Sequence, residues 1–202
     1  MKMIKTMTDS YFNEKARILG NCYLVIEGIH TYHYEFQVKG NEALVLCDEE
    51  SYLEDVVTEY HKHNLHIYKY FTQENSFFMT FDQMYTFKLP ISILQVTNIF
   101  LDQSHLDTLR KYLPLETIVY PVQIIEDEYV ILDKHHSLYL AQEDGMKMVD
   151  VYVDESICAH KGYLYLAKEQ NIKTVKDMQI VSHEEFENIQ KQLENLFEAY
   201  NL

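Results

Sequence analysis

Apolar and polar positions alternate along much of the first eighty residues, and this period of two predicts an antiparallel sheet. The clearest case lies in the aromatic-rich stretch 18–38, where three aromatic residues of the run Tyr32–Gln37 alternate with polar ones. Gly40-Asn41 has the composition of a hairpin turn and leads into a return strand over 43–47. Two further strand patterns lie within residues 65–87.

One helical period interrupts these strands. Residues 49–62 carry apolar side chains at three- and four-residue steps, and Asp48 stands where a helix cap belongs. Residues 1–12 show neither period and are expected to form a loose leader. We therefore interpret residues 1–84 as an α+β unit of antiparallel sheet with a helix, whose role the sequence does not indicate.

A second series of strands and helices begins near Phe87. Leu89-Pro90-Ile91 predicts an edge strand, because proline has no N–H to donate to a neighbouring strand. Ser104 is expected to open the following helix, with an acidic residue three positions later completing the capping pattern, and Pro114 to end it.

The stretch 118–153 is the most regular part of the chain. Two short β-branched and aromatic runs meet at Glu126-Asp127, which is typical of a hairpin. Asp133 stands at a helix-cap position and Gly145 where a helix ends in the left-handed conformation. Residues 148–153 alternate valine with polar or aromatic residues, which predicts a half-buried strand.

The remaining residues predict a helical tail. Asp154 is expected to cap a helix that reaches about Asn171, and Ser182 opens a capping box. The last helix repeats its apolar residues at helical spacing and could pack on its own unit or form a homodimer contact. Residues 85–202 are therefore expected to be a mixed α/β unit with a helical tail, so that the whole chain belongs to the α+β class.

Composition excludes several classes of function. The chain has 202 residues and a net charge of −15, so a nucleic-acid backbone would be repelled. No segment approaches eighteen consecutive apolar residues, and we expect no contact with a membrane. Cys22, Cys47 and Cys158 are far apart and odd in number, which favours free thiols in a cytoplasmic protein.

Polar residues concentrate at one junction, where a strand turns into the helix after Leu132. The run Asp133-Lys134-His135-His136-Ser137 occupies that junction. The first N–H groups of a helix have no partner within it, and the positive end of its dipole lies at the same place. This junction is therefore the expected anion site of the chain.

The order of motifs over residues 89–153 resembles the ParB/sulfiredoxin-like superfamily. The pattern runs from an LP-x-x-x-I strand through a helix and a P-(I/V)-x-(I/V) strand to an (I/V)-x-D-G-H-H-R-x-x-A turn, a glycine and a V-P-V strand. The corresponding segments here are Leu89–Ile93, Pro121–Ile124, Ile131–Ala141, Gly145 and Val149–Val151. The tail from Ile172 is similar to those of small stand-alone Firmicute members.

This resemblance implies that the turn holds a small phosphorylated ligand: members bind CTP in partition proteins, ATP in sulfiredoxins, and ADP or ATP in free-serine kinases. The implied cofactor is ATP, ADP or another nucleotide with Mg²⁺. Here the loop is DKHHS in place of DGHHR, with Lys134 at the glycine position and Ser137 at the arginine position. A serine supplies one neutral hydrogen bond where arginine would grip two oxygens.

Residues of the loop, the tail and the segment before the first helix distinguish between the activities that the resemblance implies. A sulfiredoxin needs a cysteine in the loop, and residues 133–140 contain none. A partition protein needs a basic helix-turn-helix downstream, whereas the tail here is acidic. A free-serine kinase needs a carboxylate base before its first helix, and Asp102 stands near that position, with the alternative that it only precedes a helix cap.

Two hypotheses follow. In the first, the chain is a degenerate superfamily member, a non-catalytic or weakly binding interaction module that keeps the fold. In the second, it is a small-molecule phosphotransferase or nucleotide hydrolase, with Asp102 and His136 as catalytic residues and the loop 133–137 around the phosphates. No metal site is expected, because His61, His63 and His66 cross a helix-to-strand join without fixed geometry.

Overall fold

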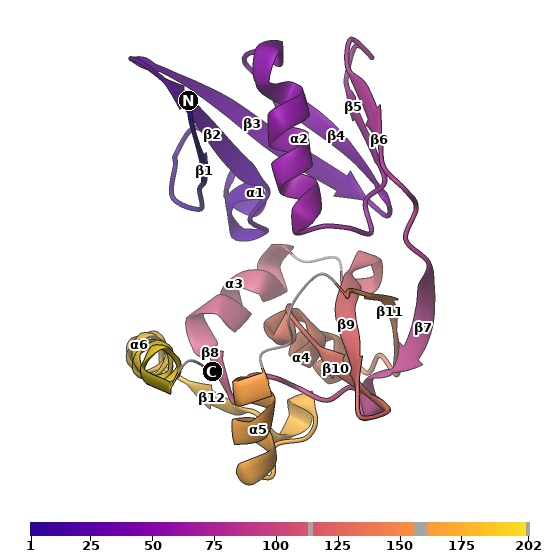
Figure 1. Ribbon diagram of the computed structural model, residues 1–202, viewed down its shortest axis with the longest axis vertical. Coiled ribbons are helices and arrows are strands. Elements are labelled where there is room, and N and C mark those ends of the chain that lie inside the picture. Colours follow the sequence, from indigo (N-terminus) through magenta and orange to yellow (C-terminus); the bar gives the residue numbers. More distant parts are fainter. Residues whose placement is uncertain (113–114, 156–160, 201–202) are drawn as a thin grey trace. The chain divides into compact units, whose positions relative to one another are not determined.

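The computed structural model describes residues 1–112, 115–155 and 161–200, and the chain divides into two compact units, Met1–Tyr85 and Thr86–Leu202 (Figure 1). Each unit combines sheet and helix, so the α+β class is confirmed. No helix in the described ranges has both the length and the apolar character needed to cross a bilayer.

The first unit is built on one six-stranded sheet. Its neighbouring strands are antiparallel, except for one parallel pair, β4 with β5. Helix α2 makes the crossover that this parallel pair requires. In sheet order the strands are β1 (Lys2–Lys5), β2 (Cys22–Glu27), β3 (His30–Lys39), β4 (Glu42–Cys47), β5 (Lys69–Thr72) and β6 (Phe78–Thr80); the helical segments are α1 (Glu14–Ile18), a 3₁₀ turn (Glu50–Tyr52) and α2 (Leu53–Lys62).

The core of the first unit lies between the sheet and α2, which crosses one of its faces in Figure 1. The ring of Phe36 on β3 stacks on that of Tyr60 on α2, with centroids 3.7 Å apart. The predicted alternation along β3 is confirmed: Tyr34 and Phe36 are fully buried, whereas Glu35 and Gln37 are not. The predicted stripe of α2 is confirmed as well, since Leu53, Val56, Val57 and Tyr60 are its buried residues.

Two local predictions for the first unit are wrong. The supposed leader contains β1, which pairs with β2 from a distant part of the sequence. Asp48 does not cap a helix; Glu49 accepts the hydrogen bond from the backbone N–H of Ser51 instead. The carboxylate of Asp48 is already bound to Tyr11 and His33.

The second unit is built on a four-stranded mixed sheet and a separate pair of short parallel strands. The strands of the larger sheet, in order, are β10 (Glu128–Ile131), β9 (Val119–Ile125), β11 (Met148–Val153) and β7 (Thr86–Pro90); the smaller pairs β8 (Phe100–Asp102) with β12 (Gln179–Val181). The helices are α3 (Gln103–Tyr112), α4 (His135–Glu143), α5 (Lys161–Glu169) and α6 (His183–Tyr200), and 3₁₀ turns cover Ile91–Ile93, Leu115–Thr117 and Val175–Asp177. Pro90 lies on the edge strand, as predicted.

The regular stretch 118–153 folds largely as its pattern predicts. Glu126 and Asp127 both have positive φ and turn β9 into β10. Helix α4 ends before Gly145, whose φ of +81° lies in the left-handed region. Leu138 and Ala141 of α4 are fully buried in the core of the unit.

Capping in the second unit differs from the predictions. Asp102 rather than Ser104 provides the capping oxygen of α3, because its Oδ1 accepts from both the N–H and the hydroxyl of Ser104. The cap of α4 is Lys134 and not Asp133. At α6, the Ser182 hydroxyl accepts from the N–H of Glu185, as predicted. Residues 113–114 and 156–160, which include Pro114, Cys158 and the expected start of the helix after Asp154, lie outside the described residues.

Candidate functional site

The candidate site is the junction where α4 begins. Lys134 adopts a left-handed conformation with φ of +65°, although its Cβ makes this conformation costly, by about 1–2 kcal/mol for an L-residue. Its N–H donates to Asp133 Oδ1 at 2.6 Å, and its ammonium donates to the carbonyl oxygen of Val119 at 2.9 Å. The lysine side chain is therefore bound to β9 instead of extending into solvent.

His135 faces the interior of the second unit. Only 7% of the residue is exposed, and its Nε2 lies 3.2 Å from the backbone N–H of Thr97 and 3.1 Å from the Thr97 hydroxyl. That hydroxyl also donates to the carbonyl of Ile131. Burial lowers the pKa of His135 to about 4, so the ring is neutral at pH 7 and accepts the N–H.

His136 points the opposite way, toward the start of α3. Its Nε2 accepts a hydrogen bond from the backbone N–H of Asp102 at 2.9 Å. The ring packs edge-to-face with the rings of His105 and Phe186, whose centroids lie 4.7 Å and 5.8 Å away. Burial, and then the neighbouring His105 and His135, lower the pKa of His136 to about 4, so it too is neutral.

Ser137 completes the loop without facing solvent. It is buried, and its hydroxyl donates to the carbonyl oxygen of Lys134 at 2.8 Å. Of the five residues predicted to surround a phosphate, only Asp133 is exposed. The side chains of Lys134, His135, His136 and Ser137 each bind a backbone group of the protein itself.

Asp102 and His136, the two predicted catalytic residues, do come together in the structure. The Asp102 side chain is only 7% exposed, and its Oδ2 lies 2.6 Å from Nδ1 of His183, the first residue of α6. Burial alone would raise the pKa of Asp102, but hydrogen bonds from His183 and Ser104 outweigh it and lower the pKa below its ordinary value. Sequence reasoning did not find His183, because nothing in its local pattern identifies a partner so far away along the chain.

In the parts of the chain that the structure describes, no three histidine, cysteine, aspartate or glutamate residues are placed to hold a metal ion. The Nδ1–H of His61 donates to the carbonyl oxygen of Ile67, and the His61 ring stacks on that of Phe81.

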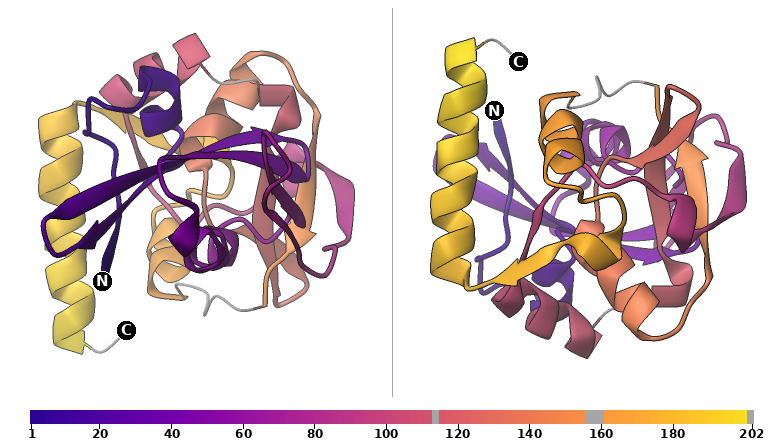
Figure 2. Two further views of the ribbon diagram at one scale, coloured as in Figure 1. Left: turned by 90° about the horizontal axis from the view of Figure 1, so that it is seen from above. Right: turned by 90° about the horizontal axis from the view of Figure 1, so that it is seen from below.

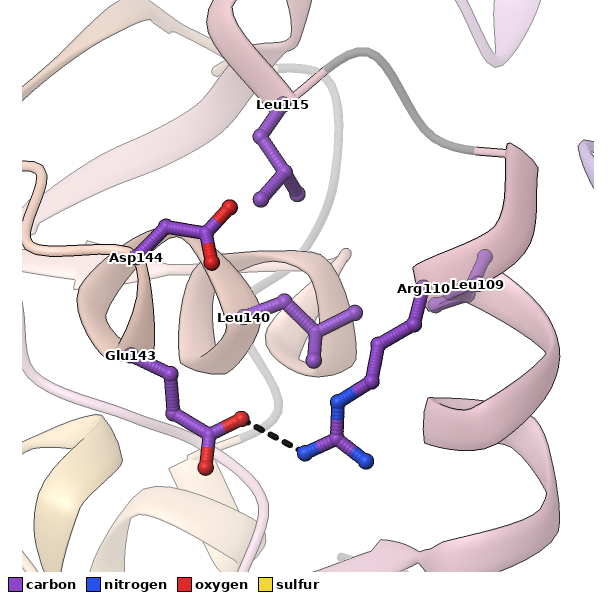
Figure 3. Close-up of a pocket in the computed structure, with 6 residues that line it drawn as sticks. All are labelled: Leu109, Arg110, Leu115, Leu140, Glu143 and Asp144. Atoms are coloured by element: carbon purple, nitrogen blue, oxygen red, sulfur yellow. Dashed lines mark hydrogen bonds and ion pairs between the residues drawn. The ribbon is translucent and has the colours of Figure 1, made fainter.

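A small pocket lies elsewhere in the second unit, at the far ends of α3 and α4. Figure 3 shows Leu109, Leu115 and Leu140 around its apolar part and the ion pair of Arg110 with Glu143, 2.6 Å apart, beside it. Its volume is about 120 Å³. No residue of the first turn of α4 lines this pocket. The pocket is therefore separate from the predicted phosphate loop.

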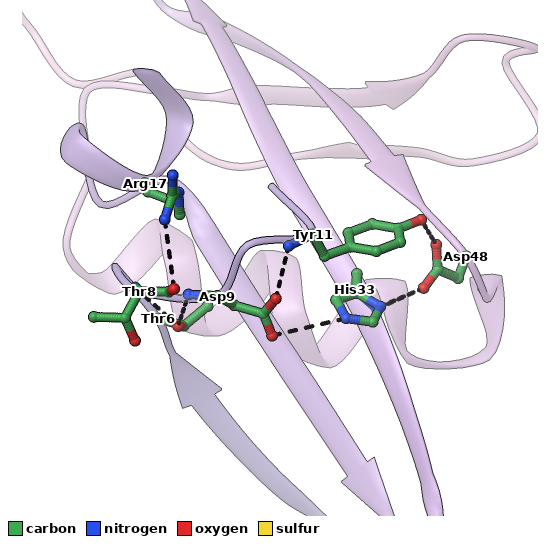
Figure 4. Close-up of polar contacts among 7 residues, drawn as sticks. All are labelled: Thr6, Thr8, Asp9, Tyr11, Arg17, His33 and Asp48. Carbon is green, nitrogen blue, oxygen red and sulfur yellow. Dashed lines mark hydrogen bonds and ion pairs between the residues drawn. The ribbon is translucent and has the colours of Figure 1, made fainter. Parts of the chain in front are cut away.

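The first unit has a polar cluster of its own. In Figure 4 the ring of Tyr11 lies on that of His33, with centroids 3.8 Å apart, while the Tyr11 hydroxyl donates to Asp48 at 2.7 Å. His33 Nδ1 lies 2.7 Å from Asp48, and its Nε2 lies 3.9 Å from Asp9. These contacts hold the segment between β1 and α1 against β3.

Comparisons with known sequences and with solved structures give the following findings. No family model matches the sequence, and no curated protein matches it. A crystal structure of protein Atu1540 from Agrobacterium tumefaciens matches at 15% identity with a TM-score of 0.35, covering 48% of this chain and 63% of that one.

A second solved structure is the C-terminally truncated chromosome-partitioning protein ParB from Caulobacter crescentus, complexed with CTP-gamma-S. It matches at 22% identity with a TM-score of 0.30, covering 44% of this chain and 53% of that one. The chain thus spans less than two thirds of either protein.

Proposed function

We propose that the second unit is a ParB/sulfiredoxin-like module in which the phosphate loop has become a structural junction, and that it acts by contact with another protein and not by catalysis. One observation carries this proposal. Each side chain from Lys134 to Ser137 is hydrogen-bonded to a backbone group of its own unit. A phosphate that bound there through these side chains would have to break those bonds.

The chemistry of the loop also disfavours tight phosphate binding. His135 and His136 are neutral, and both present Nε2 as an acceptor that is already occupied. The arginine fork of the family pattern is replaced by a buried serine. The groups left to bind an anion are the backbone N–H groups at the start of α4. Without a charged side chain beside them, they contribute only modestly to the binding free energy.

A thermal-shift scan of the full chain tests this proposal. ATP, ADP, CTP and pyrophosphate, each at 1 mM with and without Mg²⁺, should leave the melting temperature unchanged. A ligand present at about 100 times its Kd would instead add about 2.7 kcal/mol of stability. A clear rise with one nucleotide, abolished in His136→Ala but kept in the exposed-site variant His63→Ala, would contradict the proposal.

A second candidate function, a small-molecule phosphotransferase or nucleotide hydrolase, has one observation in its favour. It is supported by the hydrogen bond from the Asp102 backbone N–H to His136 Nε2, 2.9 Å long, which makes these two residues neighbours. Asp102 would take the hydroxyl proton of a substrate such as serine. Phosphate release or ADP formation from ATP, lost in Asp102→Asn, would establish this function in place of the first.

For the protein contact we propose a second copy of this chain, bound through α6. Phe186, Ile189 and Leu193 recur on one stripe of this helix, and each is only partly buried. Light scattering at 10–100 μM should therefore show a dimer that Ile189→Asp converts to a monomer. The matched control Lys191→Asp changes an exposed position of the same helix and should stay dimeric. A monomer at all concentrations would exclude this partner.

A further inference from the structure

Helix α6 is attached to the second unit by its beginning. The preceding strand β12 pairs with β8, with Val181 opposite Asp102, and the helix itself contacts β8 and α3. In both views of Figure 2 the rest of α6 runs along the side of the second unit, away from α3 and α4. Whatever fixes its first turn therefore sets the direction of the whole helix.

Two contacts fix that turn. His183 Nδ1 lies 2.6 Å from Asp102 Oδ2, and Phe186 packs against the ring of His136 one helical turn later. The two partners of the first contact differ in exposure, since the side chain of Asp102 is 7% exposed and that of His183 is 62% exposed. Solvent protons thus reach the imidazole while the carboxylate stays enclosed.

Of the histidines around this pair, only His183 has its pKa raised. On α3, His105 has its pKa lowered by burial; on α4, the same holds for His136. The acidic groups are Asp102 on β8, Asp133 before α4 and Glu187 on α6. The hydrogen bond from Asp102, and then its charge, raise the pKa of His183 above its ordinary value.

We propose that the Asp102–His183 pair is a proton-operated latch that holds the first turn of α6 on the second unit. A cation is otherwise unfavourable at a helix N-terminus, because the dipole there is positive. Asp102 therefore offsets the unfavourable interaction of the His183 imidazolium with the helix dipole. Since its folded pKa is raised, the latch is fully engaged below about pH 6.5, the ordinary histidine value, and weakens as pH rises through the folded value.

NMR on the full chain tests the latch in two ways. The pKa of the His183 ring should lie above the ordinary histidine value, and in Asp102→Asn it should fall below its value in the unmodified chain. Exchange protection of the first amides of α6, corrected for the intrinsic pH dependence of exchange, should fall by up to about fivefold between pH 5.5 and pH 8.5, the range that exposed ion pairs support.

The matched variant is His183→Gln, which keeps a donor at the same position but cannot be protonated. Its α6 protection should be independent of pH, while the fold stays unchanged. Equal protection at both pH values in the unmodified chain, or a His183 pKa that is unchanged in Asp102→Asn, would overturn the proposal. Neither result depends on nucleotide binding or on dimer formation, so the latch and the proposed function can fail separately.

Discussion

Replacing His135 by alanine should lower the free energy of unfolding of the second unit by about 3–5 kcal/mol. Two costs combine. The buried N–H of Thr97 loses its acceptor, and the core loses most of an enclosed ring. Urea denaturation of the full chain at pH 7, followed by circular dichroism and by amide resonances of β9 and β10, measures the change.

Two further variants separate these costs. His135→Gln can place its amide oxygen near the position of Nε2 and should recover part of the loss, because Thr97 regains an acceptor. His63→Ala removes an exposed ring and should change stability by less than about 0.5 kcal/mol. If His135→Ala cost no more than His63→Ala, the loop would not be a structural junction, and the proposed function would lose its main support.

Acidification should destabilise the second unit strongly between about pH 6.5 and pH 4. Burial holds the pKa values of His135 and His136 at about 4 in the folded chain, whereas an unfolded histidine titrates near 6.5. Below pH 6.5 these histidines therefore bind protons in the unfolded chain that they do not bind in the folded chain. The free energy of unfolding decreases as the pH is lowered. Each group contributes roughly 1.4 kcal/mol per pH unit over this window, so the combined loss is on the order of 5 kcal/mol.

Unfolding midpoints at pH 7, 6, 5 and 4.5, at constant ionic strength, measure this slope. His183 acts in the opposite direction, since its raised pKa favours the folded chain at acidic pH, but its exposure keeps that term small. A double variant with glutamine at positions 135 and 136 should be less stable at pH 7 and should lose much of its pH dependence between pH 6.5 and pH 4.5, while the part that is due to His105 remains. An unchanged slope in this variant would assign the acid sensitivity to other groups.

The elements with strong local signals could be predicted from the sequence. Residues 118–153 carried a turn dipeptide, a helix-ending glycine and an alternating strand, and all three appear in the structure. Strands β1, β8 and β12 were missed because each has only three or four residues, too few for a period to show. Their formation depends on partners far away in the sequence, which a local pattern cannot reveal.

At the candidate site, the sequence identified where the polar residues gather but not where their side chains point. Successive residues of a helix differ in direction by about 100°, so neighbouring His135 and His136 reach different partners, Thr97 and Asp102. Choosing between solvent and interior for each ring requires the positions of β8 and of the segment around Thr97. His183 was missed for the same reason, since its partner is supplied by tertiary structure.

The mixed sheet of the second unit is protected at both edges against growth. On one side Pro90 removes an N–H from β7; on the other, Gln95 bonds the outer backbone of β10, donating to Tyr129 and accepting from Ile131. These features remove hydrogen-bonding groups that a strand from another molecule would need, and they weaken edge-to-edge pairing, the usual hazard of open sheets.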